Sequence, residues 1–358
     1  MSRWDLTGIF WDDYVAPRVP KVKEKRVPPE PVWLNDDYLP NLDEARQHVI
    51  NNASTEAILA AWQAKHRLVF DFEVYPNYVI LGFKNIVTGE IIIFELNDGE
   101  RLEGNEREKF LWILRSFTCI GFNSTNFDLP IAMAALAGYT TQQLAEAADL
   151  LINGGEFNNG IRAYEFYRMK KMQPVHVDHI DLIELTPLGP SLKICAGRIH
   201  AKRMADLPFP AGKNLTDDQK TILRWYWCND LDNTQALYET HKTAIELREL
   251  LTKEYGVDVR SKSDPQIAEA VISTEIKRMT GRKFLEKAKI EPGRQFKYRP
   301  PAYLEYQSPT MQWVLNFIRD QVFVIDHSGS PTESEALSQL SFRINETDYQ
   351  MGIGGLHS

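Results

Sequence analysis

Two acidic residues, Asp71 and Glu73, lie within an otherwise apolar run, "HRLVFDFEVYPNYVILGF", that covers residues 66–83. In a strand, residues two apart point to the same side, so both carboxylates would face the same neighbours. A buried strand gains nothing from two adjacent carboxylates, because each charge must be desolvated and each repels the other. The pair therefore indicates a cation between them. A divalent metal ion is the first candidate, and it needs further ligands from elsewhere in the chain.

Two further acids are positioned to complete such a site. Asp128 lies in "GFNSTNFDLP", where a predicted strand meets a predicted helix. Asp230 lies in "RWYWCNDLDNTQALY" on a predicted helix, four residues after Tyr226. Because residues i and i+4 share one helix face, Tyr226 and Asp230 can look into the same cavity.

Other polar residues of these segments are interpreted as structural. Asp232 lies two residues beyond Asp230 and so faces elsewhere on the helix. Asp178 and Asp181, in "HVDHIDLIEL", are competing ligands, but a structural role at a strand end is favoured because four acids already complete the set. The same structural interpretation applies to three histidines, namely His176, His179 and His200.

The chain has 358 residues, of which 43% are hydrophobic and 11% aromatic, enough for one large or two modest globular domains. Residues 1–40 include a proline-rich, basic run that predicts an extended arm, with a solvated linker favoured over a phosphate-contacting arm. Strands followed by alternating strands and helices predict an α/β or α+β domain over residues 41–255. Residues 256–358 predict a smaller unit or connector of helix and strands.

Within the larger domain, the spacing of apolar and turn-forming residues predicts individual elements. Residues 67–96 predict an antiparallel meander, and "TCIGFN" predicts a short buried strand ending at Asn123. Residues 176–185 predict another strand. Residues 127–151 and 216–251 predict helical stretches, the second capped by Thr216 or Asp217.

Composition restricts the function and the compartment. A net charge of −8 argues against a protein that coats nucleic acid by bulk electrostatics, but it allows an enzyme that grips a few phosphates. No run of 18 apolar residues predicts a membrane span, and the first residues, "MSRWDLTGIFWDDYV", show no signal peptide. Three widely separated cysteines indicate neither a disulfide framework nor a zinc site, so a reducing cytoplasm is expected.

The three acidic segments resemble the ordered motifs of DEDD-type 3′→5′ proofreading exonucleases of the tyrosine variant. Those motifs are D-x-E, N with two or three residues before F/Y-D, and Y-x-x-x-D. They match Asp71-Phe72-Glu73, "NSTNFD" ending at Asp128, and "YWCND" from Tyr226 to Asp230. Each motif alone is common, whereas all three in this order are specific. The segments "PSLKICAGRIHAKRMADLP", "SKSDPQIAEAVI" and "GIGGLHS" further resemble parts of phage-encoded DNA polymerases of the B type.

This resemblance implies a ribonuclease H-like α/β fold, a mixed sheet flanked by helices, with two Mg²⁺ or Mn²⁺ ions about 4 Å apart. It implies that Asp71 bridges both ions, that Glu73 and Asp230 complete the site that activates water, and that Asp128 holds the second ion directly or through water. Tyr226 would orient the attacking water by its hydroxyl, and the alternative for Tyr226 is a core aromatic.

The resemblance also implies contacts to nucleic acid. Asn123, Phe127, Ser191 and Leu192 would bind the single-stranded 3′ end, although a core position is nearly as well favoured for Phe127. A lysine near the scissile phosphate is typical of this family, and the sequence does not choose between Lys193, Lys202 and Arg203, each of which has a solvated surface position as its alternative.

Residues 276–300 contain nine Lys or Arg against two acids, with Phe284, Phe296 and Tyr298 interleaved. This pattern is the most basic and aromatic of an acidic chain and is typical of a surface that guides DNA. A solvated charged helix face is the slightly favoured alternative.

The expected function is therefore metal-dependent 3′→5′ exonuclease activity on single-stranded DNA, as a proofreading domain of a phage-type DNA polymerase in the host cytoplasm. Its expected partners are the DNA 3′ end and a polymerase domain or other replication proteins, with no membrane. No polymerase motif is present and the chain ends as though a polymerase palm had been separated from it, so hydrolysis without DNA synthesis is expected. Two alternatives are an exoribonuclease on the same scaffold and a non-catalytic DNA-binding module, which predicts loss of a metal ligand.

Overall fold

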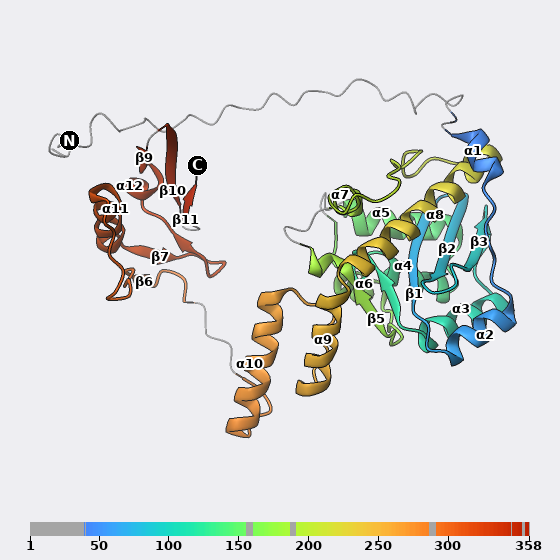
Figure 1. Ribbon diagram of the computed structural model, residues 1–358, viewed down its shortest axis with the longest axis horizontal. Coiled ribbons are helices and arrows are strands. Elements are labelled where there is room, and N and C mark those ends of the chain that lie inside the picture. Colours follow the sequence, from blue (N-terminus) through green and yellow to red (C-terminus); the bar gives the residue numbers. More distant parts are fainter. Residues whose placement is uncertain are drawn as a thin grey trace. The chain divides into compact units, whose positions relative to one another are not determined.

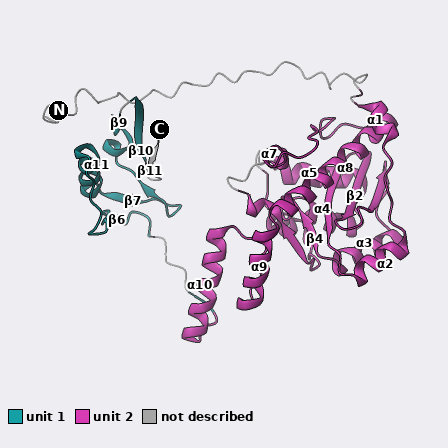
Figure 2. Cartoon of the chain, in the orientation of Figure 1, with its two compact units in different colours: residues 1–27, 284–358 teal, residues 28–283 magenta. Residues whose placement is uncertain are grey.

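The computed structural model describes residue 39 and residues 41–154, 160–186, 191–285, 291–344, 346–352 and 355–357. It divides the chain into two compact units, residues 28–283 and residues 284–358 with 1–27 (Figure 2). The arm predicted over residues 1–40 lies outside the described residues except for Leu39. The larger unit extends past residue 255, where the sequence placed the end of the first domain, and includes a further helix.

The larger unit is an α/β structure built on one mixed sheet (Figure 1). Its strands are β1 (Leu68–Tyr75), β2 (Tyr78–Asn85), β3 (Ile91–Asn97), β4 (Cys119–Gly121) and β5 (His179–Asp181). They lie in the order β3-β2-β1-β4-β5. The first three strands form the antiparallel meander predicted over residues 67–96, which is confirmed, whereas β4 and β5 extend the sheet in parallel beyond β1.

Helices cover both faces of this sheet. The helices described in the larger unit are α1 (Leu42–Gln47), α2 (Thr55–Gln63), α3 (Gly104–Ser116), α4 (Asp128–Leu136), α5 (Thr141–Asn153), α6 (Ala163–Lys170), the 3₁₀ helix η3 (Leu182–Leu185), α7 (Leu192–Arg198), α8 (Asp217–Thr240), α9 (Lys242–Tyr255) and α10 (Asp264–Thr280), of which α10 projects away from the sheet (Figure 1). The buried side chains of α3, α4 and α5 belong to one core cluster, and those of α7 and α8 belong to another.

The two core clusters lie on opposite faces of β1 because side chains alternate along a strand. Leu68, Phe70 and Phe72 belong to the cluster with α3, α4 and α5. Val69 and Tyr75 belong to the cluster with α8. The two acids of β1 share the odd-numbered face, so the alternation directs both of them towards α8.

Two predicted elements are shorter than the sequence suggested. The strand predicted over residues 176–185 forms only at His179–Asp181, because the Asp181 carboxylate then accepts the Ile183 N–H at 3.2 Å and begins η3. The helical stretch predicted over residues 216–251 is two helices that meet at His241.

The helix starts follow local capping. Thr216 caps α8 as predicted, in a capping box with Gln219. The stretch predicted as helical over residues 127–151 is divided between α4 and α5, because Gly138 takes a left-handed conformation with φ of 85° and Thr140 then caps α5.

In its described residues, the smaller unit combines two helices with six short strands. Its elements are β6 (Gln295–Phe296), α11 (Pro309–Asp320), β7 (Phe323–Ile325), β8 (Pro331–Thr332), α12 (Glu335–Ser338), β9 (Ser341–Ile344), β10 (Thr347–Gly352) and β11 (Gly355–His357). They form two three-stranded sheets, β6-β7-β8 and β9-β10-β11. The helix and strands predicted over residues 256–358 are confirmed, with β7 in "QVFVIDHSG" and β9 in "LSFRI".

Candidate functional site

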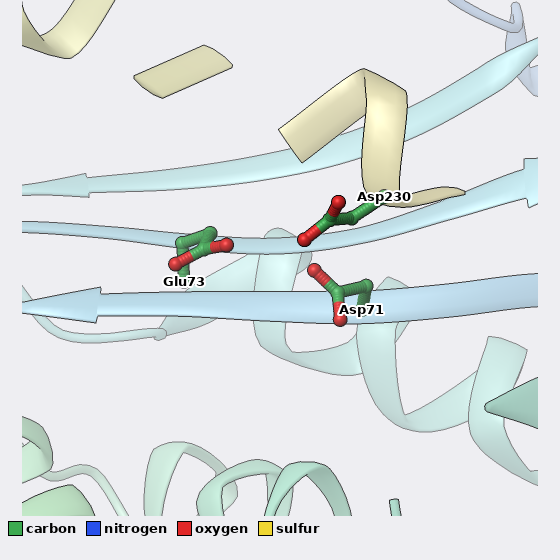
Figure 3. A group of neighbouring side chains, drawn as sticks. All are labelled: Asp71, Glu73 and Asp230. Carbon is green, nitrogen blue, oxygen red and sulfur yellow. The ribbon is translucent and has the colours of Figure 1, made fainter. Parts of the chain in front are cut away.

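Three carboxylates from two separate elements meet above the centre of the sheet. Asp71 and Glu73 come from β1 and Asp230 from α8, and one ligand oxygen from each lies within 4.8 Å of those of the other two. Figure 3 shows the three side chains directed into a common space between the strand and the helix. The fold therefore places Asp230 beside Asp71 and Glu73, which lie more than 150 positions earlier in the sequence, as a metal site requires.

Helix α8 is held against β1 at the position of the site. The indole N–H of Trp227 donates to the main-chain carbonyl of Asp71 at 2.9 Å, and Trp227 is fully buried. Gly82 is the β2 residue paired with Asp71, and a Cβ at Gly82 would lie 2.0 Å from the Trp227 ring. The glycine therefore provides the space in which the indole packs. This pair was not among the residues predicted from the sequence, where a glycine inside an apolar strand was its available signal.

Burial raises the pKa of each acid in the cluster, and repulsion from neighbouring acids adds to the rise for Asp71 and Glu73. For Asp71 the largest cause is burial, followed by the charges of Asp128, Glu73 and Asp230, and its pKa lies well above the usual range. The pKa of Glu73 is also well above its usual range, again chiefly because of burial. Burial raises the pKa of Asp230 to about 6. Such a cluster favours protonation or a bound cation.

Asp128 is the first residue of α4 and is buried beside this cluster. Its Oδ1 accepts the main-chain N–H of Phe72, between the two acids of β1, at 2.9 Å. Burial raises the pKa of Asp128 to about 8, while this hydrogen bond acts in the opposite direction. Asp128 lies outside the group with oxygens within 4.8 Å, but its charge raises the pKa of Asp71.

The loop that precedes Asp128 is anchored on β5. Ser124 is completely buried, and its Oγ lies 2.8 Å from Nε2 of His179. The main-chain N–H of Thr125 donates to Oδ2 of Asp181 at 2.9 Å, and the Asp181 N–H donates to Ser261 Oγ at 2.8 Å. These bonds are the kind of structural role at a strand end that was favoured for Asp181.

Tyr226 and Lys193 adjoin the carboxylates. Tyr226 lies one helical turn before Asp230 and is 4% exposed, and its hydroxyl interaction lowers the pKa of Asp230. Burial and the charge of Glu73 raise the pKa of Tyr226, so its hydroxyl stays protonated. Lys193 Nζ lies 5.7 Å from the Tyr226 ring centroid, and its positive charge lowers the pKa of Glu73 and of Asp230.

The other two basic candidates have different surroundings. Arg203 forms an ion pair with Glu44 and lies 5.0 Å from the centroid of Trp225, whereas Lys202 is exposed. Lys193 also reaches Asp206 at 3.2 Å, but Asp206 is almost fully solvated and holds it weakly. Of the three, Lys193 is the residue whose positive charge lowers the pKa of acids in the cluster.

The residues predicted to bind the 3′ end occupy the two segments beside the site. Asn123 has a left-handed conformation with φ of 54°, and Phe127 is partly buried against the first core cluster. Ser191 caps α7, with its Oγ accepting the Ile194 N–H at 3.4 Å, and Leu192 packs against the second core cluster. Each therefore has a contact within the fold, and their role towards nucleic acid stays a prediction.

A separate hollow of about 420 Å³ lies beside α4 and α6. It contains none of the acids, Tyr226 or Lys193. Most of its lining is apolar, and the lining residues are Thr125, Leu129, Met133, Ala163, Tyr167, Pro174, Val175, His176 and Val177.

Comparison with known proteins adds no family assignment, because no protein-family model and no curated protein matches the sequence. The helices in the described part of the chain include none that combines the length and apolar character needed to cross a membrane.

Proposed function

We propose that this protein is a metal-dependent 3′→5′ exonuclease that hydrolyses single-stranded DNA from its 3′ end. The observation that carries the proposal is the convergence of Asp71, Glu73 and Asp230 within 4.8 Å, with Tyr226 one turn from Asp230 on α8. Buried acids this close together destabilise the fold unless a cation binds between them, because burial raises the pKa of all three and repulsion raises those of Asp71 and Glu73 further.

A ribonuclease H-like fold is the architecture that we propose for the larger unit. An antiparallel meander followed by two parallel strands, in the order β3-β2-β1-β4-β5, is compatible with that fold. The acids lie on the central strand and on a helix crossing it, and Asp128 begins the helix after β4. Fold alone does not imply function, so the proposal depends on the site.

The donor set fits two Mg²⁺ or Mn²⁺ ions. Hard divalent ions prefer oxygen ligands, and the cluster offers carboxylates without histidine or cysteine. Asp71, Glu73 and Asp230 would hold the ions, with Asp128 at the neighbouring position. When bound, such ions neutralise phosphate charge and lower the pKa of water.

The neighbouring side chains would supply positioning. The protonated Tyr226 hydroxyl, beside Asp230, can both donate and accept a hydrogen bond and so orient a water molecule. Lys193 supplies a positive charge beside the carboxylates, where a phosphate oxygen would need it. The seating of an unpaired end by Asn123, Phe127, Ser191 and Leu192 would use stacking and backbone contacts rather than base recognition.

The direction of cleavage, the preference for DNA and the partnership with a phage-type polymerase rest on the motif resemblance. An exoribonuclease differs only in the sugar that it accepts, and the carboxylates do not read the sugar. A non-catalytic DNA-binding module is less consistent with the site, because all four acids and Tyr226 are present around one space.

The decisive experiment is digestion of 5′-labelled single-stranded DNA with Mg²⁺ or Mn²⁺, beside a matched RNA. We expect products that shorten stepwise from the 3′ end and that disappear in Asp71→Ala. Asp232→Ala is the matched control, since Asp232 lies on the same helix but is mostly solvated and pairs with Lys84. Full activity in Asp71→Ala would refute the site, and faster digestion of RNA would favour the exoribonuclease.

A further inference from the structure

The smaller unit exposes a segment in which aromatic and basic side chains alternate. We define the aromatic–basic strip as residues 294–306, "RQFKYRPPAYLEY". All of its residues are exposed except Pro300 and Leu304, which are half-buried. It continues the basic run recognised in residues 276–300, which the structure divides between α10 in the larger unit and the strip in the smaller one.

The exposure of the strip's rings is unusual for side chains of this size. Tyr303 is 86% exposed, and Phe296, Tyr298 and Tyr306 are about 40% exposed. Phe296 stacks one side of its ring on Phe323 at 5.5 Å between centroids, which leaves the remainder to solvent. Aromatic rings gain most when buried, so a group of them in solvent marks a contact surface.

The charge of the strip is positive along most of its length. Arg294, Lys297 and Arg299 are its cations, and its only acid is Glu305 near its end. Among the described residues, the ion pair of Arg294 is a long contact of 3.8 Å with Glu291, and it contributes little because both side chains are largely exposed. In the part of the chain that the structure describes, neither Lys297 nor Arg299 pairs with a carboxylate.

The strip is fixed to the fold at both ends. At its start, the Ile325 N–H of β7 donates to the carbonyl of Arg294 at 2.9 Å, and β6 pairs with β7. At its end, the Tyr306 N–H donates to Gln312 of α11 at 2.9 Å. The rings and cations are therefore displayed on an anchored segment, which lowers the ordering cost of binding.

We propose that the aromatic–basic strip is a binding surface for single-stranded nucleic acid, formed by residues other than those of the carboxylate site. Stacking on rings and pairing of Lys and Arg with phosphates are the two contacts by which proteins hold single strands without reading sequence. A polyanion also complements a positive segment within a chain of net charge −8. Binding by the strip needs no hydrolysis, so it can be tested independently of the proposed exonuclease activity.

The test uses the full chain with Asp71→Ala in EDTA, so that no cleavage disturbs the binding curve. Fluorescence anisotropy would follow a labelled oligothymidylate and its RNA equivalent.

We expect Tyr303→Ala to weaken binding roughly tenfold, since stacking on one ring contributes about 1–3 kcal/mol per base. Tyr303 is so exposed that its removal leaves folding intact. Tyr164→Ala, which removes an exposed tyrosine of the larger unit, is the matched control and should not change binding.

The charge contribution is tested by salt dependence. Combined Lys297→Ala and Arg299→Ala should reduce the slope of log K against log salt by about 1.4, because each phosphate contact on a single strand contributes about 0.7. The control is Lys65→Ala with Arg115→Ala, which removes two exposed cations near α2 and α3. Equal losses in the control would overturn the proposal.

Two other results would also overturn it. One is unchanged affinity in both the Tyr303→Ala and the double-cation variants. The other is displacement of the oligonucleotide by polyglutamate at equal charge, because an acidic peptide offers charge without bases and would identify a protein partner instead. Photocrosslinking of 5-iodouracil DNA to residues 294–306 would support the strip directly.

Discussion

The indole N–H of Trp227 donates to the main-chain carbonyl of Asp71, and this bond of 2.9 Å joins helix α8 to strand β1 beneath the carboxylate cluster. Trp227 lies three residues before Asp230 on the helix, so the same contact sets the height of Asp230 above Asp71. The absence of a side chain at Gly82 makes this approach possible.

We predict that Gly82→Ala destabilises the fold by about 1–3 kcal/mol, because the added methyl overlaps a buried ring. Urea unfolding of the metal-free protein measures the loss. Trp227→Phe alone should cost about 1 kcal/mol through the lost hydrogen bond, with a further cost for the smaller ring. Gly82→Ala should be less costly in the Trp227→Phe background, and additive losses would show that the two residues do not compete for the same space.

The raised pKa values predict that the metal-free protein is less stable at neutral than at mildly acidic pH. Well below the ordinary Asp pKa of 3.8, these carboxyls are protonated in both the folded and the unfolded state. As pH rises, the unfolded chain releases protons first, while Asp230 and Asp128 hold theirs to about 6 and about 8. The free energy of unfolding should therefore fall through this range, by an amount on the order of a few kcal/mol.

Denaturant unfolding in EDTA between pH 4 and 8 checks the sign of this dependence. Asp128→Asn should make the fall less steep in its upper part, because burial raises the pKa of Asp128 to about 8. Stability that rises steadily across this range, in wild type and variant alike, would contradict the predicted repulsion among the acids.

A bound divalent metal ion should offset the loss of stability that the buried acids cause. At pH 8 we expect Mn²⁺ to raise the melting temperature of the wild-type chain, because an ion that binds only the folded state stabilises it. Asp71→Asn should melt higher than wild type in EDTA, since one repelling charge is gone, and should lose most of the Mn²⁺ shift. Asp232→Asn should retain the shift, because that side chain lies outside the cluster.

The sequence was sufficient to predict the acids and the elements that carry them. Apolar runs separated by turn-forming residues indicated the meander over residues 67–96, and the two-residue spacing placed Asp71 and Glu73 on one face, as the structure has them. The i and i+4 spacing put Tyr226 and Asp230 on one helix face, and both lie beside Glu73. These features depend on local periodicity, which a single sequence displays directly.

The remaining features depend on contacts between distant segments. A glycine inside an apolar strand signals a close contact, but the residues around Gly82 do not identify Trp227 as its partner. The predicted strand over residues 176–185 was too long, because Asp181 begins the helix η3. The choice among Lys193, Lys202 and Arg203 needed the distance to Tyr226 and the electrostatic effect on Glu73. Such relationships are set by packing across the sheet and have no periodic signature.

Lys193 should matter for cleavage and Lys202 should not. The charge of Lys193 reaches Glu73 and Asp230, so Lys193→Ala should lower kcat by about 10²-fold or more, a typical cost of removing one stabilising charge. Lys202→Ala removes an exposed cation and serves as the matched control. Steady-state cleavage of single-stranded DNA measures both, and equal losses in the two variants would remove the distinction drawn here.

Asp181 should act as a positioning residue through the loop before Asp128. Its carboxylate accepts the N–H groups of Thr125 and Ile183, so Asp181→Ala leaves two donors without partners and should cost about 2–4 kcal/mol of stability. Asp181→Asn keeps one acceptor oxygen and should recover part of that loss.

Because the loop leads into Asp128, Asp181→Asn should also raise the Mn²⁺ concentration needed for half-maximal cleavage while KM for DNA changes little. Asp258→Asn, which alters the partly exposed ion pair and hydrogen bonds of Asp258 with Arg260, is the comparison. An unchanged Mn²⁺ requirement in a folded Asp181→Asn protein would show that the loop holds Asp128 without help from β5.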